Sequence, residues 1–153
     1  MALLLHSLSN PVMLKRPLHS RFGSKVITGI KRTTIRDTPW PVDKPIMLYH
    51  WSARPYASKQ QNLAPVAALK TIPISITHLP SGEMAYVLEI PLSSLHDDTH
   101  PSATPFSELS LWQLEGFDSR EDMDTWFRAK LKPGQTVHKH LMRFKLMNLK
   151  PET

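Results

Sequence analysis

Proline is the residue that most constrains this chain, because 14 prolines are spread through its 153 residues, which include only 5 glycines. A proline inside a helix removes a backbone hydrogen bond and clashes with the preceding turn. We therefore expect short helices and strands separated by loops rather than long uninterrupted helices. The length is that of one domain, and the hydrophobic fraction of 41% is ordinary for a globular protein.

Apolar spacing predicts more strands than helices. Strands are predicted at 12–14, 31–36, 45–51, 66–76, 85–90 and 137–147. Helices are predicted after Pro17, from Thr104 and from Ser119, the first of them ending at Gly29 and the last starting with a capping serine. Because the strands come in runs rather than alternating with helices, the pattern favours a mixed α+β, barrel-like domain over a doubly wound sheet.

The ends and the composition narrow the class of protein. Residues 1–11 are predicted to be an N-terminal edge or frayed segment ahead of a single domain over 12–150. The absence of cysteine excludes a disulfide framework, a zinc ribbon and thiol catalysis. The apolar start at 2–5 is far shorter than the roughly 20 residues that span a bilayer and lacks the features of a secretory signal. We therefore expect a cytoplasmic protein with no membrane partner.

Charge is distributed unevenly along the chain, whose formal net charge is +6. Residues 1–70 carry 11 lysines and arginines against two acids, 71–136 carry four against ten, and 137–153 carry four against one. Such asymmetry is typical of a basic face that binds a polyanion, of which nucleic acid is the commonest in the cytosol. The alternative is a basic protein whose charge serves only solubility.

Aromatic and basic residues alternate between Tyr49 and Lys59. Aromatic rings can stack on unpaired bases while cations hold phosphates, so Arg54, Tyr56 and Lys59 are predicted to contact RNA. The alternative is a core strand followed by an ordinary loop. His138 and His140 share a strand face but no third ligand accompanies them, so neither a metal nor another cofactor is expected.

Two separated motifs resemble those of a known family. The first is Ile-Thr-Gly-Ile-Lys-Arg-Thr-Thr-Ile-Arg-Asp at 27–37, and the second is Leu-Glu-Gly-Phe-Asp-Ser at 114–119, followed by an aromatic helix at Trp126 and Phe127. With a closing strand at 141–144, they resemble the ASCH family, small mixed β-barrels related to the PUA fold. The likeness covers about a third of the chain and leaves 38–104 unaligned. It implies a mixed β-barrel with flanking short helices and a basic cleft.

The resemblance also implies binding of RNA or of a modified nucleoside in that cleft. In the acetylcytidine amidohydrolase branch the proposed catalytic set falls on Lys31, Thr34 and Glu115 of this sequence, with Arg36 on the following arginine of the motif. That branch hydrolyses the amide of an acylated cytidine. Another branch cuts single-stranded RNA, and a module that binds RNA without chemistry is a further alternative. Arg32 stands where the family often has threonine, and we group it with the binding residues.

The residue types suit amide hydrolysis if Lys31 is neutral. A threonine hydroxyl needs a base to act as a nucleophile. Lys31 is a base only when neutral, which desolvation favours and a nearby Glu115 carboxylate opposes. A protonated Glu115 would donate a proton to the leaving amine, and Arg36 shares a strand face with Thr34. The alternative is a solvated strand in which Glu115 pairs with Lys31.

Overall fold

The structure is a computed structural model that describes residues 13–42, 44–56, 58–95 and 109–147. The elements, in chain order, are β1 (Leu14–Pro17), η1 (Ser20–Phe22), α2 (Gly23–Ile27), β2 (Thr33–Arg36), β3 (Pro45–Trp51), β4 (Gln60–His78), β5 (Met84–Leu88), η2 (Leu92–Leu95), α3 (Leu111–Glu115), α4 (Arg120–Arg128) and β6 (Thr136–Leu146). No helix within these ranges is both long enough and apolar enough to cross a membrane.

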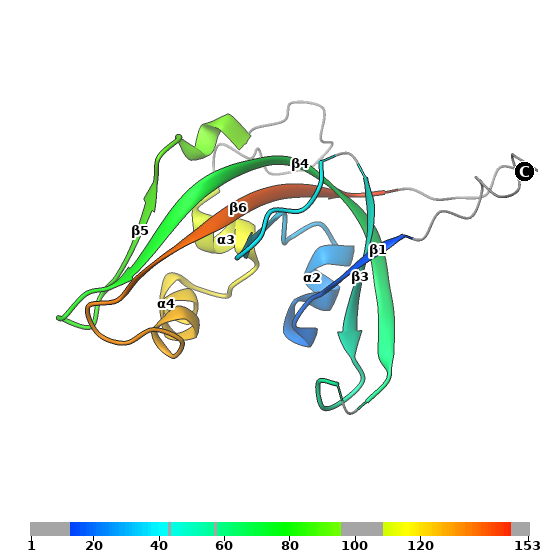
Figure 1. The fold of residues 1–153 in the computed structure, drawn as a ribbon, viewed down its shortest axis with the longest axis horizontal. Coiled ribbons are helices and arrows are strands. Elements are labelled where there is room, and N and C mark those ends of the chain that lie inside the picture. The colour runs from blue at the N-terminus through cyan, green and yellow to red at the C-terminus, as the bar shows by residue number, and fades with distance from the viewer. Residues whose placement is uncertain (1–12, 43, 57, 96–108, 148–153) are drawn as a thin grey trace, which may run out of the picture.

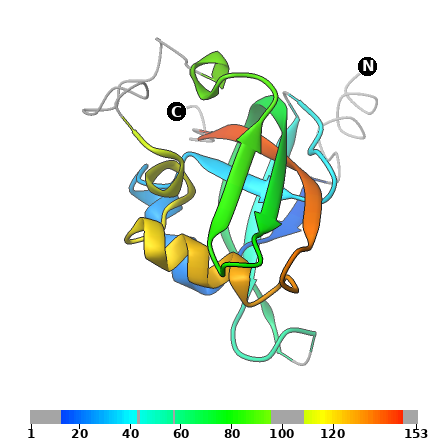
Figure 2. The ribbon, with the colours of Figure 1, turned by 90° about the vertical axis from the view of Figure 1, so that its left-hand side faces the viewer.

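A single sheet organises the fold around the 19-residue strand β4. The strand order is β1-β3-β4-β6-β2, and β5 pairs with β4. Val66 has a register partner in β3 and another in β6, and Ile74 has partners in β5 and β6, so β3 and β5 share one edge of β4. Figure 2 shows β5 and β6 on either side of β4. Among the described strands, β1 pairs with β3 in parallel and the other strand pairs are antiparallel.

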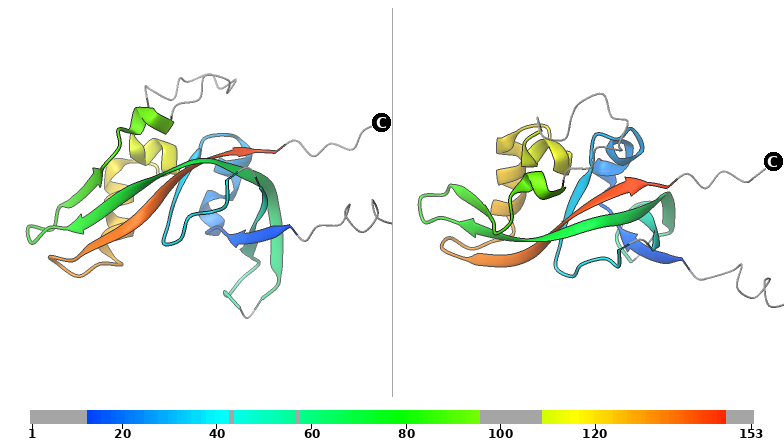
Figure 3. Two further views of the ribbon diagram at one scale, coloured as in Figure 1. Left: turned by 45° about the horizontal axis from the view of Figure 1, so that its top comes forward. Right: turned by 90° about the horizontal axis from the view of Figure 1, so that it is seen from above.

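The sheet is curved and its helices lie on one side. Figures 1 and 3 show β4 and β6 arching together, with α2, α3 and α4 on the concave side. A shift of register between Ala68 and Lys70 interrupts the pairing of β4 with β6. Such bulges bend a strand and increase its twist. The core lies between the concave face and the helices, where Ile46, Leu48 and Ile72 are fully buried.

The expected α+β class is confirmed, but the expected closed barrel is not observed. The described strands form an open sheet in which β1 and β2 occupy the two ends of the strand order. β1 pairs only along β3 and β2 only along β6 in the described part of the chain, so no pair closes the sheet. Whether strands close into a barrel depends on tilt and stagger between distant segments, which strand spacing in the sequence does not specify.

Most predicted elements are confirmed. The helix after Pro17 is η1 followed by α2, and the chain turns at Gly29 with a φ of 80°. Ser119 caps α4, and its hydroxyl accepts a hydrogen bond of 3.0 Å from the Asp122 amide. The first strand starts two residues later than predicted, and β4 extends the prediction in both directions. The segment 1–11 and the predicted helix start at Thr104 lie outside the described residues.

Candidate functional site

Four side chains that the sequence singled out, Lys31, Thr34, Arg36 and Glu115, line one cavity. The cavity has a volume of about 340 Å³, within the range of roughly 300–1,000 Å³ typical of small-molecule sites. Thr34 and Arg36 come from β2, Lys31 precedes this strand, and Glu115 ends α3. The fold therefore brings together two motifs that are about eighty residues apart in the sequence.

Lys31 is buried, and its ammonium lies close to the Glu115 residue. Its Nζ donates a 2.7 Å hydrogen bond to the backbone carbonyl of Glu115 and lies 3.8 Å from carboxylate atom Oε1. The ammonium is also 4.8 Å from the centre of the Phe22 ring. Burial lowers the pKa of Lys31 from 10.5 to about 8; the Glu115 carboxylate opposes this shift and Arg36 adds to it. Near pH 8, half of the Lys31 side chains are therefore neutral and able to accept a proton.

The Glu115 carboxylate is held by Thr33, a residue that the sequence analysis did not select. The Thr33 hydroxyl donates a 2.6 Å hydrogen bond to Oε2 of Glu115. Both side chains are buried, with Thr33 completely inaccessible. A hydrogen bond to an ionised, buried acceptor is stronger than one between neutral groups and fixes the acceptor's orientation. Thr33 thus positions one carboxylate oxygen while the other stays on the Lys31 side.

Thr34 and Arg36 lie on the same face of β2, as the period of two requires. Nε of Arg36 donates a 3.0 Å hydrogen bond to Oγ1 of Thr34. Because the Thr34 oxygen accepts this bond, its own proton is free to be donated in another direction. The Arg36 guanidinium also stacks at 5.0 Å from the centre of the buried Trp40 ring, which restricts its orientation.

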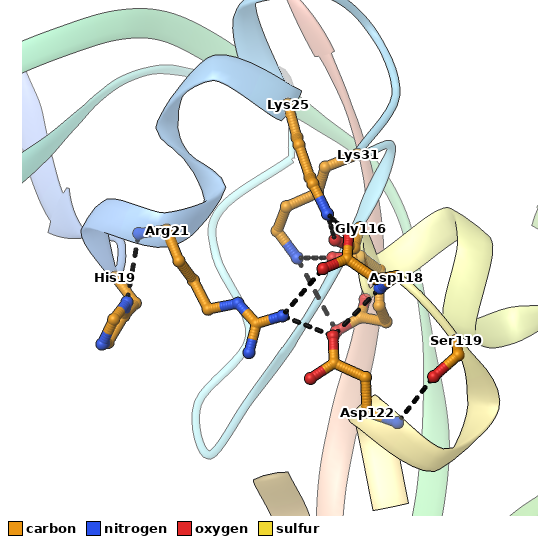
Figure 4. A network of polar contacts seen from close by, with 9 residues as sticks. His19, Arg21, Lys25, Lys31, Gly116, Asp118, Ser119 and Asp122 are labelled. Atoms are coloured by element: carbon orange, nitrogen blue, oxygen red, sulfur yellow. Dashed lines mark hydrogen bonds and ion pairs between the residues drawn. The ribbon is translucent and has the colours of Figure 1, made fainter.

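A polar network fastens helix α2 to the turn that carries Glu115. Figure 4 shows Arg21, Lys25 and Lys31 pointing toward the turn between α3 and α4. Lys25 donates 2.6 Å hydrogen bonds to the Gly116 carbonyl and to the Asp118 carboxylate, and Arg21 pairs with Asp122. These bonds connect residues more than ninety positions apart and hold the segment directly before the first motif against the turn that follows Glu115.

Gly116 allows the two motifs to approach each other. It has a φ of 90° and caps α3 in the left-handed conformation. A Cβ atom placed on it would lie 3.1 Å from Cβ of Lys31 and 3.4 Å from Cδ1 of Phe22. Any other residue at this position would therefore be strained in its backbone and would push against Lys31.

Aromatic rings form one wall of the cavity, contributed by Phe22, Phe117, Trp126 and Phe127. Phe22 and Phe117 meet edge to face with ring centres 5.2 Å apart, and each also contacts Trp126. The Arg21 guanidinium lies between 5.0 and 5.6 Å from the rings of Phe22, Phe117 and Trp126. The wall is therefore rigid and apolar, which suits the face of a planar ring.

The other predicted binding residues do not line this cavity. Arg32 is buried, and its Nε donates to the Gly29 carbonyl at 3.2 Å. Arg54, Tyr56 and Lys59 are exposed on the connection between β3 and β4. Within the described ranges no three histidine or acidic side chains gather in a way that would hold a metal ion, and His138 lies 2.9 Å from the Ser75 hydroxyl.

Sequence reasoning missed Thr33, which holds Glu115 from outside the cavity, and it did not select the cavity-lining side chains of His19, Lys130 and Lys139. Each comes from a different segment, and nothing in the local pattern marks them. The basic character of the 1–70 segment pointed to the chemistry but not to these positions.

Comparison of the chain with protein-family models, with curated proteins and with solved structures found no match in any of the three.

Proposed function

We propose that this chain is an ASCH-type, PUA-related domain that binds a modified nucleoside in the basic cavity and hydrolyses the amide of an N4-acylated cytidine. One observation carries the proposal: Lys31, Thr34 and Glu115, which resemble the catalytic set of the acetylcytidine amidohydrolases, line one cavity together with Arg36. The pKa of Lys31, lowered to about 8 by burial, further supports a role as a base near neutral pH.

In the proposed reaction, neutral Lys31 accepts the hydroxyl proton of Thr34 as the threonine oxygen bonds to the acyl carbon. The bond from this carbon to N4 of the base then breaks, and the Lys31 ammonium formed in the first step, which the Glu115 carboxylate stabilises, supplies the proton that N4 needs. Cytidine leaves, and water hydrolyses the acyl-threonine ester. Arg36 orients the Thr34 hydroxyl through their 3.0 Å hydrogen bond.

The remainder of the cavity matches a nucleoside in size and character. Its aromatic wall provides apolar surface for the base, and its volume of about 340 Å³ admits one nucleoside rather than a duplex. Five basic side chains, His19, Lys31, Arg36, Lys130 and Lys139, line it against one acid, Glu115. This excess favours ligands rich in hydrogen-bond acceptors or negative charge.

The test is turnover of N4-acetylcytidine by the wild-type protein and by Lys31→Met, Thr34→Val and Glu115→Gln. Each variant should lose at least about a hundredfold in activity, since proton transfer alone typically contributes that much. Thr77→Val is the matched control, because Thr77 bonds to Thr136 outside the cavity. An inactive wild type, or undiminished turnover in all three variants, would contradict the proposal.

A second candidate, RNA binding without chemistry, is favoured by the β3–β4 connection. Tyr56 is 90% exposed with a φ of 62°, and its ring lies 5.1 Å from that of Trp51. An exposed aromatic side chain held in a strained conformation suits base stacking, with Arg54 and Lys59 close by in the chain for phosphates. Binding of labelled single-stranded RNA should then weaken steeply with salt and in Tyr56→Ala. Cleavage fragments on a gel would instead indicate a ribonuclease.

A further inference from the structure

The cavity has two chemically different ends, set by the course of β2. Lys31 precedes this strand and lies with Glu115, whereas Arg36 is its last residue. β2 runs antiparallel to β6, and Arg36 is paired with His140. Lys139, the neighbour of His140, therefore lies beside the end of β2, where its ammonium pairs with Asp37. The Lys31–Glu115 pair thus lies where β2 begins, and Arg36 and Lys139 lie where it ends.

A third cation reaches the same end from the connection between α4 and β6. Lys130 lines the cavity, and its Nζ lies 3.9 Å from the centre of the Trp126 ring. Among the residues that the structure describes, neither Arg36 nor Lys130 forms an ion pair with a carboxylate. The one carboxylate paired with Lys139, that of Asp37, is 81% exposed. Positive charge at this end is thus only partly compensated.

The three cations are close enough to repel one another. The pKa of Lys130 is lowered, first by burial and then by the charges of Lys139 and Arg36. Repulsion of this kind costs folding free energy, and an anion bound among the three would remove it. A guanidinium and two ammonium groups around an open volume match the charge and the donor geometry that phosphate oxygens require.

We infer that the cavity is built for a phosphorylated nucleoside, with the acylated base at Lys31, Thr34 and Glu115 and the phosphate between Arg36, Lys130 and Lys139. This inference rests on the proposed function and narrows its substrate class. The phosphate belongs either to a mononucleotide or to an RNA chain, which share the chemistry that the three cations recognise. The free nucleoside is then the weaker ligand.

Calorimetric titration of the full chain with cytidine, cytidine 5′-monophosphate, a short cytidine-containing oligoribonucleotide and inorganic phosphate tests this inference. The nucleotide should bind about tenfold more tightly than the nucleoside, since a charge-assisted hydrogen bond contributes that much. Lys130→Gln and Lys139→Gln should each reduce this preference for the nucleotide over the nucleoside several-fold. Lys132→Gln is the matched control, because Lys132 is exposed on the same connection and does not line the cavity.

The outcomes separate this inference from the proposed function. If cytidine binds but the phosphate adds no affinity, or if Lys132→Gln weakens nucleotide binding as much as Lys130→Gln, the phosphate site is refuted while the nucleoside site stands. If neither cytidine nor its monophosphate binds, the phosphate site is refuted, and turnover of N4-acetylcytidine by the wild type decides the proposed function separately. Binding of the mononucleotide as tightly as the oligoribonucleotide identifies a mononucleotide substrate, and a clear gain for the oligoribonucleotide identifies RNA.

Discussion

The Thr33 hydroxyl donates a 2.6 Å hydrogen bond to the Glu115 carboxylate across the interface between β2 and α3. The adjacent Thr34 instead lines the cavity and accepts a hydrogen bond from Arg36. Two neighbouring threonines therefore differ in position: Thr33 holds the carboxylate from behind, and Thr34 lines the cavity. The same substitution at the two positions distinguishes positioning from chemistry.

Thr33→Val removes the bond to a buried carboxylate, so it should destabilise the fold by about 1–3 kcal/mol and reduce N4-acetylcytidine turnover roughly tenfold to a hundredfold by misplacing Glu115. Thr33→Ser retains the hydroxyl and should restore both. Thr34→Val should abolish turnover with a smaller loss of stability, because cavity water can replace it beside Arg36. Urea unfolding and turnover are measured on the same variants. Equal losses of stability in Thr33→Val and Thr34→Val would contradict the prediction that only Thr33 holds the buried carboxylate.

Gly116→Ala tests the close approach of the two motifs. An alanine there pays about 1–2 kcal/mol for the left-handed backbone, and its Cβ would also meet Cβ of Lys31 at 3.1 Å. Gly134→Ala is the matched control, because Gly134 has a φ of 83° and nothing within 4 Å of an added Cβ. Gly116→Ala should therefore lose at least about 1 kcal/mol more than Gly134→Ala in chemical unfolding. Equal losses of unfolding free energy in the two variants would mean that the Lys31 side chain moves aside without destabilising the fold.

The sequence predicted the elements well where a local signal defines them. β2, β6 and α4 follow from β-branched residues, alternation and the Ser119 cap, respectively, all of which act within a few residues. The period of two also placed Thr34 and Arg36 on one face. It could not say that Thr33, on the opposite face, would meet Glu115, because that contact depends on the packing of a helix 82 residues further along.

Features that depend on long-range packing were not predictable. The open sheet replaces the expected barrel because closure depends on how distant strands tilt and stagger. Lys139 joins the cavity because β6 pairs with β2, and Lys130 because the connection after α4 returns to the cavity; neither residue stands in a recognisable motif. Composition identified Arg54, Tyr56 and Lys59 as suited to RNA, but it gave no distance between their loop and the cavity.

Arg36→Lys separates charge from orientation at the cavity. Lysine keeps the positive charge but lacks the planar Nε donor that bonds to Thr34 at 3.0 Å. Turnover should fall about tenfold or more as the hydroxyl loses its orientation, whereas the affinity for cytidine 5′-monophosphate should change less. Arg120→Lys, on the exposed side of α4, serves as the control. A loss confined to affinity, with turnover at saturation unchanged, would show that Arg36 contributes charge alone.

The lowered pKa of Lys31 gives the hydrolysis and the stability the same pH dependence. Turnover should rise with pH through about 8, because the neutral amine is the proposed base and its fraction increases there. Between pH 8 and 10.5 the unfolded chain holds a proton on Lys31 that the folded chain has released, so stability should also rise with pH across this window. Below pH 8, Lys31 is protonated in both the folded and the unfolded chain, so it no longer makes the stability depend on pH.

Lys31→Met removes the titrating group and supplies the reference for this last prediction. The difference in unfolding free energy between wild type and variant should change by about 3 kcal/mol from pH 8 to 10.5, in the direction that favours the wild type at high pH. Other groups whose protonation differs between the folded and unfolded chain in this range contribute equally to both proteins and cancel; Tyr86 is one of them, because burial raises its pKa in the folded protein. Urea unfolding at half-unit pH steps measures the difference, and parallel curves for the two proteins would place the pKa of Lys31 at its ordinary value and remove the proposed base.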